Sequence, residues 1–123
     1  MGYESRLYVV EKHKNFYPSD NNMVWGEVVA VFDLCKCYPV SDELCKYPNT
    51  NAYIYADDGN TEILEDKYGE KLKEIPVKDT IKIIKKAMKN DNYSYRRYKP
   101  CLKLLEGFNL DEWNDLVVLH YGY

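Results

Sequence analysis

The sequence has no long apolar run, because stretches such as Val28–Val31 are far shorter than the roughly 20 residues that a helix needs to cross a bilayer. The opening, MGYESRLYVVEK, lacks the cationic start and apolar segment of a secretory signal. A glycine-rich phosphate loop, an HExxH zinc motif and a GxSxG nucleophile motif are also absent from the sequence. We therefore predict a cytoplasmic protein that is not an enzyme.

Cysteine is sparse, and the spacing of the four cysteines is not that of a standard zinc site. His13 or His120 would be needed to complete a set of four ligands. Free cysteine is usually a small buried hydrophobe, and a chain without an export signal is expected to keep its thiols reduced. We expect no metal and no cofactor, and reduced thiols at Cys35, Cys37, Cys45 and Cys101.

Phenylalanine and tryptophan are also few, with three and two residues, whereas tyrosine is abundant, with 13 of 123 residues. Tyrosine combines a large apolar ring with a polar tip, so it suits half-buried strands and contact surfaces alike. The length is typical of one hydrophobic core, and no repeat or linker divides the chain. The sequence therefore predicts a single domain over residues 1–123 that binds something.

Alternation of apolar and polar residues predicts two strands in the first third of the chain. They cover Arg6–Lys12 and Met23–Cys37, and the polar segment His13–Asn22 between them is expected to be a loop. The next segment, Tyr38–Asn51, contains two prolines and is predicted to be a connection with one helical turn at Ser41–Cys45.

A hairpin is predicted in the middle of the chain. The strand-like runs Asn51–Ala56 and Thr61–Asp66 flank Asp57–Asn60, in which an Asp-Gly pair favours a tight turn. A second turn at Lys67–Glu70 is predicted to pair the end of this hairpin with Lys71–Ile75.

After Pro76 the pattern becomes helical, because four apolar residues fall on one stripe: Val77, Ile81, Ile84 and Met88. A second helix is predicted to begin at Pro100 and to end at Gly107, and a buried strand is predicted at Leu116–Tyr121. The predicted fold is α+β, with a mainly antiparallel sheet of four or five strands and two helices packed on one face.

Charge is strongly segregated along the chain. Residues 78–103 carry nine Lys or Arg and two Asp or Glu, although the whole chain has a net charge of −3. Cations beside aromatic rings are typical of surfaces that bind phosphates or proteins. The segment 90–101 is expected to be an exposed connection between the two helices. The predicted basic contact residues are Lys78, Lys82, Lys85, Lys89, Tyr93, Tyr95, Arg96, Arg97 and Tyr98.

The predicted hairpin carries an acidic group that offers a second contact surface: Asp57, Asp58, Glu62, Glu65 and Asp66. Such a group can occupy a basic groove by charge complementarity, and the wider acidic region 57–74 can instead neutralise the basic helix within the folded protein. Asp57 and Asp58 resemble a catalytic pair, but the following glycine makes a turn the simpler interpretation. His120 lies in an apolar strand, so it is expected to be a hydrogen-bonded core residue.

Three stretches resemble a family of small uncharacterised proteins from phages and prophages of Gram-positive bacteria. They are MGYESRLYVVEK, YADDGNTEILEDKYG and YRRYKPCLKLLEGFNLDEWNDLVVLHYGY, and the resemblance covers most of the chain except Tyr38–Asn51. It implies a phage protein in the cytoplasm of an infected bacterial host. By analogy, such a protein inhibits a host antiviral system in the manner of an anti-CRISPR, by stoichiometric binding to a nuclease or its guide complex.

Two other functions remain open at this stage. One is a nucleic-acid-binding accessory protein of the phage, which would use the lysine-rich segment. The other is a sponge for a small anionic signalling nucleotide, with Arg96, Arg97 and the nearby tyrosines as contacts. The sequence leaves the oligomeric state open.

Overall fold

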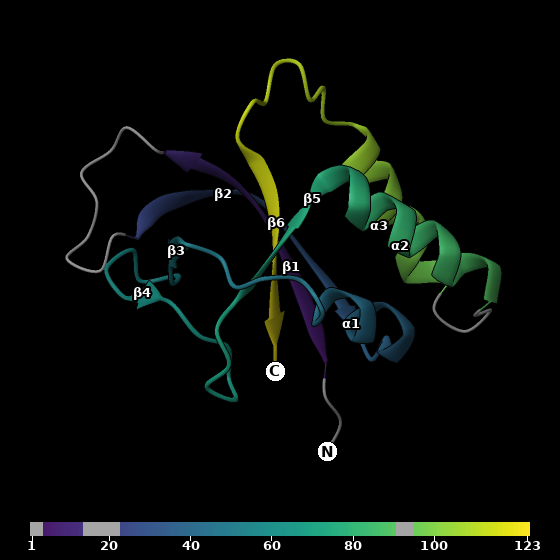
Figure 1. Cartoon of the computed structure of the whole chain (residues 1–123), viewed down its shortest axis with the longest axis horizontal. Helices are drawn as coiled ribbons and strands as arrows, with labels where there is room; N and C mark the ends of the chain where they lie inside the picture. The colour runs from purple at the N-terminus through teal and green to yellow at the C-terminus, as the bar shows by residue number, and fades with distance from the viewer. Residues whose placement is uncertain (1–3, 14–22, 91–94) are drawn as a thin grey trace.

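The computed structural model describes residues 4–13, 23–90 and 95–123, which form a six-stranded sheet and three helices (Figure 1). The elements in chain order are β1 (Ser5–His13), β2 (Val24–Cys35), α1 (Tyr38–Leu44), β3 (Ala52–Tyr55), β4 (Glu62–Ile63), β5 (Lys73–Pro76), α2 (Val77–Asn90), α3 (Tyr95–Glu106) and β6 (Leu116–Gly122). No helix within these ranges combines the length and the apolar character needed to pass through a membrane.

The α+β prediction is confirmed, and the predicted sheet of four or five strands is corrected to six. The strand order is β4-β3-β2-β1-β6-β5, and the pair of β2 with β3 is parallel, so the sheet is mixed. The segment Lys71–Ile75, which was predicted to pair with the hairpin, instead contributes β5, and β5 pairs with β6 at the opposite edge of the sheet, a partner that no local sequence pattern specifies.

Strand β1 lies at the centre of the sheet and pairs antiparallel with β2 on one side and with β6 on the other. Tyr8, for example, lies opposite Val31 on β2 and Leu119 on β6. The β-branched runs of these three strands suit a pleated surface with apolar contacts on both faces. The predicted strands at Arg6–Lys12, Met23–Cys37 and Leu116–Tyr121 are therefore confirmed to within two residues at each end.

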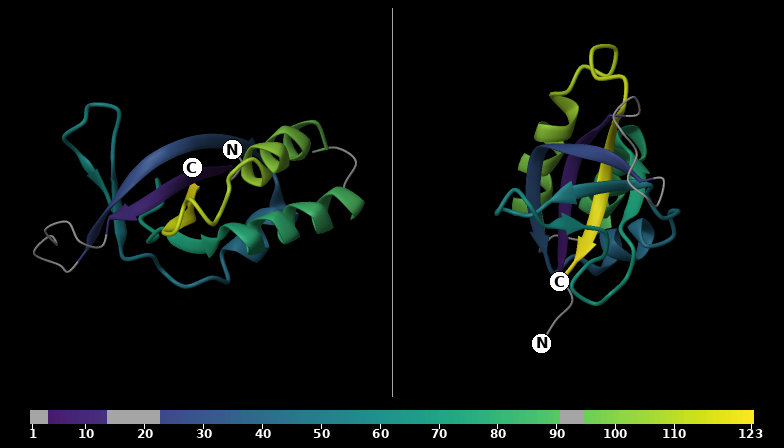
Figure 2. Two further views of the ribbon diagram at one scale, coloured as in Figure 1. Left: turned by 90° about the horizontal axis from the view of Figure 1, so that it is seen from above. Right: turned by 90° about the vertical axis from the view of Figure 1, so that its left-hand side faces the viewer.

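The sheet curls until its two sides nearly meet (Figure 2). A bridge joins Asn49 to Lys73 of β5, and the Thr50 amide donates to the Leu72 carbonyl at 2.8 Å. The segment that leads into β3 thus lies beside β5 and closes a ring of strands. The apolar residues enclosed by this curl form a second, smaller core: Val10, Ala52, Ile54, Leu72 and Leu119.

The three helices cover the other face of the sheet, with α2 and α3 side by side (Figures 1 and 2). The larger core lies between these layers and includes Leu7 of β1, Ile84 of α2, and Tyr98 and Leu105 of α3. The predicted stripe of α2 is confirmed, because Val77 and Ile84 are buried and Ile81 and Met88 are partly buried.

Three local predictions need correction. Helix α1 begins at Tyr38, before the predicted turn, because Pro39 fits the first turn of a helix, where its missing N–H is no loss. Helix α3 begins at Tyr95 rather than at Pro100, so most of the predicted exposed connection is helical. The predicted pairing of the hairpin with Lys71–Ile75 is reduced to one bridge between Glu65 and Lys71.

The loop predicted after the first strand begins one residue later, because His13 belongs to β1, and the rest of that loop lies outside the described residues. The predicted hairpin turn is confirmed. Gly59 has a φ of +74°, and Gly69 in the following turn has a φ of +80°, a backbone conformation that glycine adopts without strain.

Candidate functional site

The outer side of α2 and α3 forms one basic surface, which we call the basic helical surface. Its nine cations are exposed and include six of the predicted contact residues, namely Lys78, Lys82, Lys85, Lys89, Arg96 and Arg97, together with Lys86, Lys99 and Lys103. They reach the surface because the apolar stripe of each helix turns toward the sheet. The structure therefore brings these six predicted residues together on one layer of the molecule.

Few acids neutralise this surface. The ammonium of Lys85 lies 3.6 Å from a carboxylate oxygen of Glu106, and both side chains are about half exposed, so the pair contributes little to stability. Within the described part of the chain, Lys78, Lys82 and Lys89 have no carboxylate within 4.0 Å. These lysines are consequently available to an external anion.

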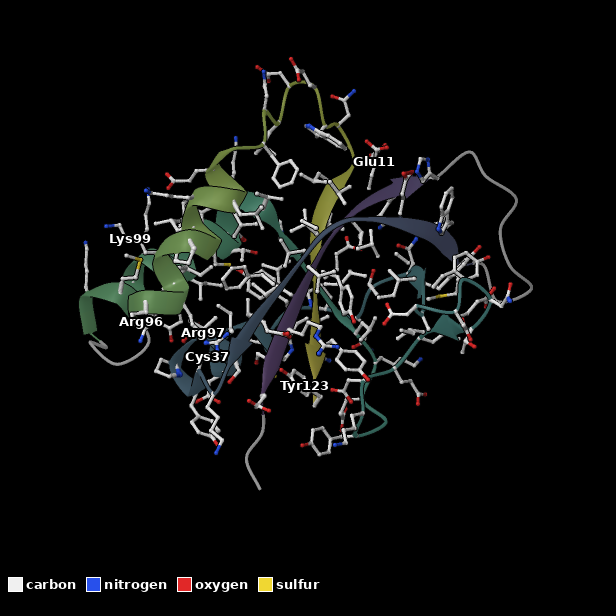
Figure 3. The ribbon with its side chains drawn as sticks, turned by 180° about the vertical axis from the view of Figure 1, so that it is seen from behind. Glu11, Cys37, Arg96, Arg97, Lys99 and Tyr123 are labelled. Carbon is white, nitrogen blue, oxygen red and sulfur yellow. The ribbon has the colours of Figure 1, made fainter. Side chains whose placement is uncertain are left out.

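Arg97 differs from its neighbours because it also fastens α3 to the sheet. Its guanidinium donates to the backbone carbonyl of Asp33 at the end of β2, with a distance of 3.1 Å. Figure 3 shows Arg96 and Lys99 pointing away from the body of the molecule, whereas Arg97 lies on the side of α3 near Cys37. Arg96 is therefore the better candidate for a contact residue.

Of the three predicted contact tyrosines, Tyr98 is the one whose side chain the structure describes. Tyr98 is fully buried in the larger core, so its assignment as a contact residue is wrong. The error arises because Tyr98, Cys101 and Leu105 form the inner stripe of a helix that the sequence analysis began too late. Tyr95 is the first residue of α3, and Tyr93 lies outside the described residues.

A groove of about 460 Å³ runs along the boundary between α1 and α2. Lys82 and Lys86 form its basic wall, and Asp42 and Glu43 of α1 form an acidic wall. The remaining lining is apolar and comes from Pro39, Ile83 and Ala87. This part of the basic helical surface thus combines both signs of charge with apolar contacts, which is typical of protein–protein interfaces.

The acidic hairpin (Asp57, Asp58, Glu62, Glu65 and Asp66) contains two carboxylates that form turns. Asp58 accepts hydrogen bonds from the amides of Asn60 and Thr61, each at 2.9 Å, and from the Thr61 hydroxyl at 2.6 Å. The hydroxyl bond, with the two amide bonds, lowers the pKa of Asp58 to about 2. Asp66 accepts from the amides of Tyr68 and Glu70 in the next turn. The remaining outward charges are Asp57, Glu62 and Glu65, all exposed.

The acidic hairpin and the basic helical surface lie at opposite ends of the molecule (Figures 1 and 2). The possibility that the hairpin neutralises the basic helix is therefore excluded. The acids near the basic surface come instead from α1 and from the end of α3. Because exposed charges are screened over about 8–10 Å at physiological salt, a partner bound at one end is little affected by the charges at the other end.

A further cluster joins residues that are distant in sequence. Arg6 contacts Asp33 across β1 and β2 at 2.6 Å, and its guanidinium lies 4.6 Å from the centre of the Tyr123 ring. The pKa of Arg6 lies above its ordinary value, and the hydrogen bond to Asp33 is the largest cause. This cluster holds the sheet end against which Arg97 docks. Sequence reasoning missed it because its residues come from β1, from β2 and from the residue that follows β6.

The metal-binding potential of the described residues does not involve cysteine. Cys37 and Cys101 are buried, and Cys45 is exposed. His120 is buried beside Ser5, so the predicted core role is confirmed. The described side chains that converge as possible ligands are Glu11, His13 and Glu27.

Comparisons of the chain with protein-family models, with curated proteins and with solved structures find no match.

Proposed function

We propose that this protein acts without catalysis, by stoichiometric binding of a macromolecular partner through the basic helical surface. The partner in this proposal is a host antiviral nuclease or its guide complex, in the cytoplasm of an infected bacterial cell. The observation that carries the proposal is the separation of charge, with exposed lysines on α2 and α3 far from the acidic hairpin. The phage-like stretches of the sequence support the choice of partner.

The spacing of the cations suits an extended anionic surface. Lys78 and Lys89 are 11 residue steps apart on one helix, with Lys82 and Lys85 between them, and a rise of 1.5 Å per residue places the four along about 16 Å. That length reaches several carboxylates of a protein patch or several phosphates of a guide RNA. Electrostatic attraction of this kind accelerates association and weakens as salt increases.

The groove beside Lys82 favours a protein component in the partner. Bare nucleic acid gains nothing from Asp42 and Glu43, which repel phosphates, whereas a protein offers cations for these acids and apolar side chains for Ile83 and Ala87. The same surface then accommodates both signs of charge on the partner.

Two charge-reversal variants test this proposal. The basic variant carries Lys82→Glu, Lys89→Glu and Arg96→Glu, and the matched acidic variant carries Asp57→Lys, Glu62→Lys and Glu65→Lys. Each is expressed in CRISPR-immune cells, and phage plaques are counted; inhibition of the purified nuclease is measured in parallel. We expect the basic variant to lose protection of the phage and the acidic variant to retain it. Loss in the acidic variant alone, or retention in both, contradicts the proposal.

Direct binding of nucleic acid is a second candidate, favoured by the lysines that lack a carboxylate partner. A mobility-shift series with single- and double-stranded probes tests it. A protein that neutralises Z phosphates of duplex DNA loses affinity as salt increases, and log Kd rises with log salt with a slope of about 0.9Z. No shift at low salt removes this candidate, and a shift that the basic variant abolishes supports it.

A further inference from the structure

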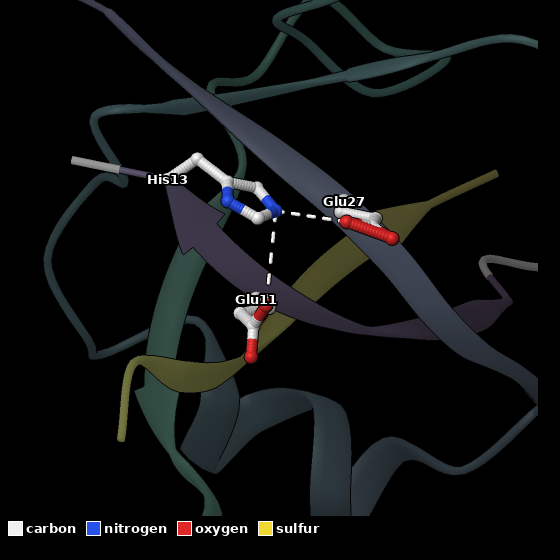
Figure 4. Close-up of side chains that lie close together, drawn as sticks. All are labelled: Glu11, His13 and Glu27. Carbon is white, nitrogen blue, oxygen red and sulfur yellow. Dashed lines mark hydrogen bonds and ion pairs between the residues drawn. The ribbon is translucent and has the colours of Figure 1, made fainter. Parts of the chain in front are cut away.

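The pairing of β1 with β2 brings three possible metal ligands onto one face of the sheet. Glu11 of β1 lies directly opposite Glu27 of β2, and His13 lies two residues beyond Glu11. Because side chains two residues apart point to the same face of a strand, all three converge (Figure 4). Lys12, between them in sequence, points to the other face and binds Glu74 at 2.9 Å.

The distances within this group suit a single ion. Nε2 of His13 lies 2.8 Å from a carboxylate oxygen of Glu27 and 3.7 Å from one of Glu11. The three ligand atoms all lie within 4.8 Å of one another. A zinc ion bound at 2.0–2.2 Å in tetrahedral geometry separates its ligand atoms by about 3.3–3.6 Å. Small side-chain rotations are therefore sufficient to place all three ligands around one ion.

The electrostatics of the group favour a divalent cation. Two carboxylates directly opposite each other in a sheet repel, which destabilises the pair of strands. In the described part of the chain, His13 is the one group that forms an ion pair with Glu11 or Glu27, and it carries a charge only when protonated. A divalent cation at this position binds the imidazole nitrogen and both carboxylates, and it neutralises the repulsion between the two acids.

The histidine ring is held in place by a group outside the cluster. Trp25, the register partner of His13, stacks on the imidazole with ring centres 4.7 Å apart and an angle of 21° between the planes. This contact restricts the ring while Nε2 remains directed at the carboxylates. The ligands come from two strands rather than from a loop, so their spacing is fixed by the sheet.

We propose that Glu11, His13 and Glu27 bind a divalent transition-metal ion of the zinc class, with the remaining coordination positions open to solvent or to a partner. One imidazole nitrogen and two carboxylate oxygens suit zinc and its neighbours, whereas magnesium prefers oxygen ligands alone. The side chains are 30–50% exposed, so an ion can reach them from solution. This site lies away from the basic helical surface and is independent of the function proposed above.

Calorimetric titration with zinc chloride tests the site in the full chain. Cys35→Ser and Cys45→Ser form the background, which removes two cysteines as competing ligands. We expect one zinc ion per chain and a shift of the His13 ring resonances on binding. Magnesium in excess is expected to leave zinc binding unchanged.

The variants distinguish the site from general surface binding. Glu27→Gln preserves the side-chain shape and removes the charge of one proposed ligand. Loss of a residue that only hydrogen-bonds to a metal ligand costs about tenfold or more in affinity, so this variant is expected to weaken zinc binding at least about tenfold. His13→Gln is expected to abolish it, and the control Glu62→Gln, an exposed acid of the hairpin, is expected to retain it. Equal affinity in all variants, the absence of binding, or displacement by magnesium overturns the proposal. Circular dichroism verifies that each variant is folded.

Discussion

The hydroxyl of Ser5 lies 2.8 Å from Nε2 of His120, and both side chains are buried where β1 pairs with β6. Ser5 and His120 come from opposite ends of the described chain, so this hydrogen bond depends on the complete sheet. The imidazole is held in its neutral form, because burial lowers the pKa of His120 to about 4. Nearby Asp66 opposes this effect, and Lys73 reinforces it.

We predict that the protein loses stability between pH 6.5 and pH 4. An unfolded histidine binds a proton near pH 6.5, whereas His120 in the fold does so only near pH 4. The unfolded state therefore binds more protons in this window, and the free energy of unfolding falls by up to roughly 3 kcal/mol as the pH decreases. Urea denaturation across this range measures the effect.

An NMR titration assigns this effect to His120. We expect the His120 ring to resist protonation to near pH 4. A His120→Gln variant, which preserves hydrogen bonding to Ser5, should show a flatter dependence of stability on pH. A His120 ring that titrates near pH 6.5 in the folded protein would contradict the prediction.

We predict that the thiols react at very different rates. Cys45 is exposed, whereas Cys37 and Cys101 are buried, and burial raises the pKa of Cys101 to about 12. Because the thiolate is the reactive form, a buried thiol with a high pKa is inert in the folded protein. In a Cys35→Ser background, iodoacetamide should modify Cys45 alone, as read by mass spectrometry. Modification of Cys101 as fast as that of Cys45 would refute this, and the same reagent under denaturing conditions is the control.

We predict that Tyr98 supports the fold and Arg96 supports binding. Tyr98 is fully buried, so Tyr98→Ala should destabilise the protein by about 3–5 kcal/mol, as for other large aromatic truncations in cores. Arg96 is exposed, so Arg96→Glu should leave the melting temperature nearly unchanged and should weaken binding to the partner. Urea denaturation and a binding assay separate the two effects. Tyr98→Phe, which retains the ring, is expected to bind the partner normally, and reduced binding by this variant would restore Tyr98 as a contact residue.

We predict that Gly59→Ala destabilises the hairpin through the backbone alone. The residue has a φ of +74°, and an added Cβ meets no atom within 4 Å, so steric contact with neighbours does not contribute. A non-glycine residue in this conformation costs about 1–2 kcal/mol. Thermal and urea denaturation measure the loss, with the exposed Asn60→Ala as the matched control. Equal stability of the two variants would show that the turn tolerates an ordinary residue.

The elements with a local signature were predictable from the sequence. Val77, Ile81, Ile84 and Met88 repeat at the helical period, and burial of one face is the cause of that repeat. The turn at Gly59 was likewise predictable, because an Asp-Gly pair favours the positive φ that this turn requires.

The elements that depend on distant contacts were not predictable. Pro100 lacks a backbone N–H, so the sequence predicts a helix that starts there. In the structure α3 continues through Pro100, because burial of Tyr98, Cys101 and Leu105 offsets the missing hydrogen bond. The cluster of Glu11, His13 and Glu27 depends on the register of β1 against β2, which residue types alone do not determine. The four exposed lysines of α2 were predictable because they follow the same helical repeat as its buried stripe, whereas Arg96 and Arg97 were predicted in a connection and lie in α3.

The central position of β1 has a consequence for how the chain folds. Ser5 lies opposite Gly122, so one of the two pairings of this strand joins residues that almost the whole described chain separates. Ordering such a long loop costs entropy before any contact within the pair repays it, which slows folding relative to proteins with local contacts. The β1–β2 hairpin can form early, but its apolar surface remains exposed to other chains until β6 arrives. The pairing of β6 with β1 therefore limits the rate of folding. It also covers apolar surface that would otherwise promote aggregation.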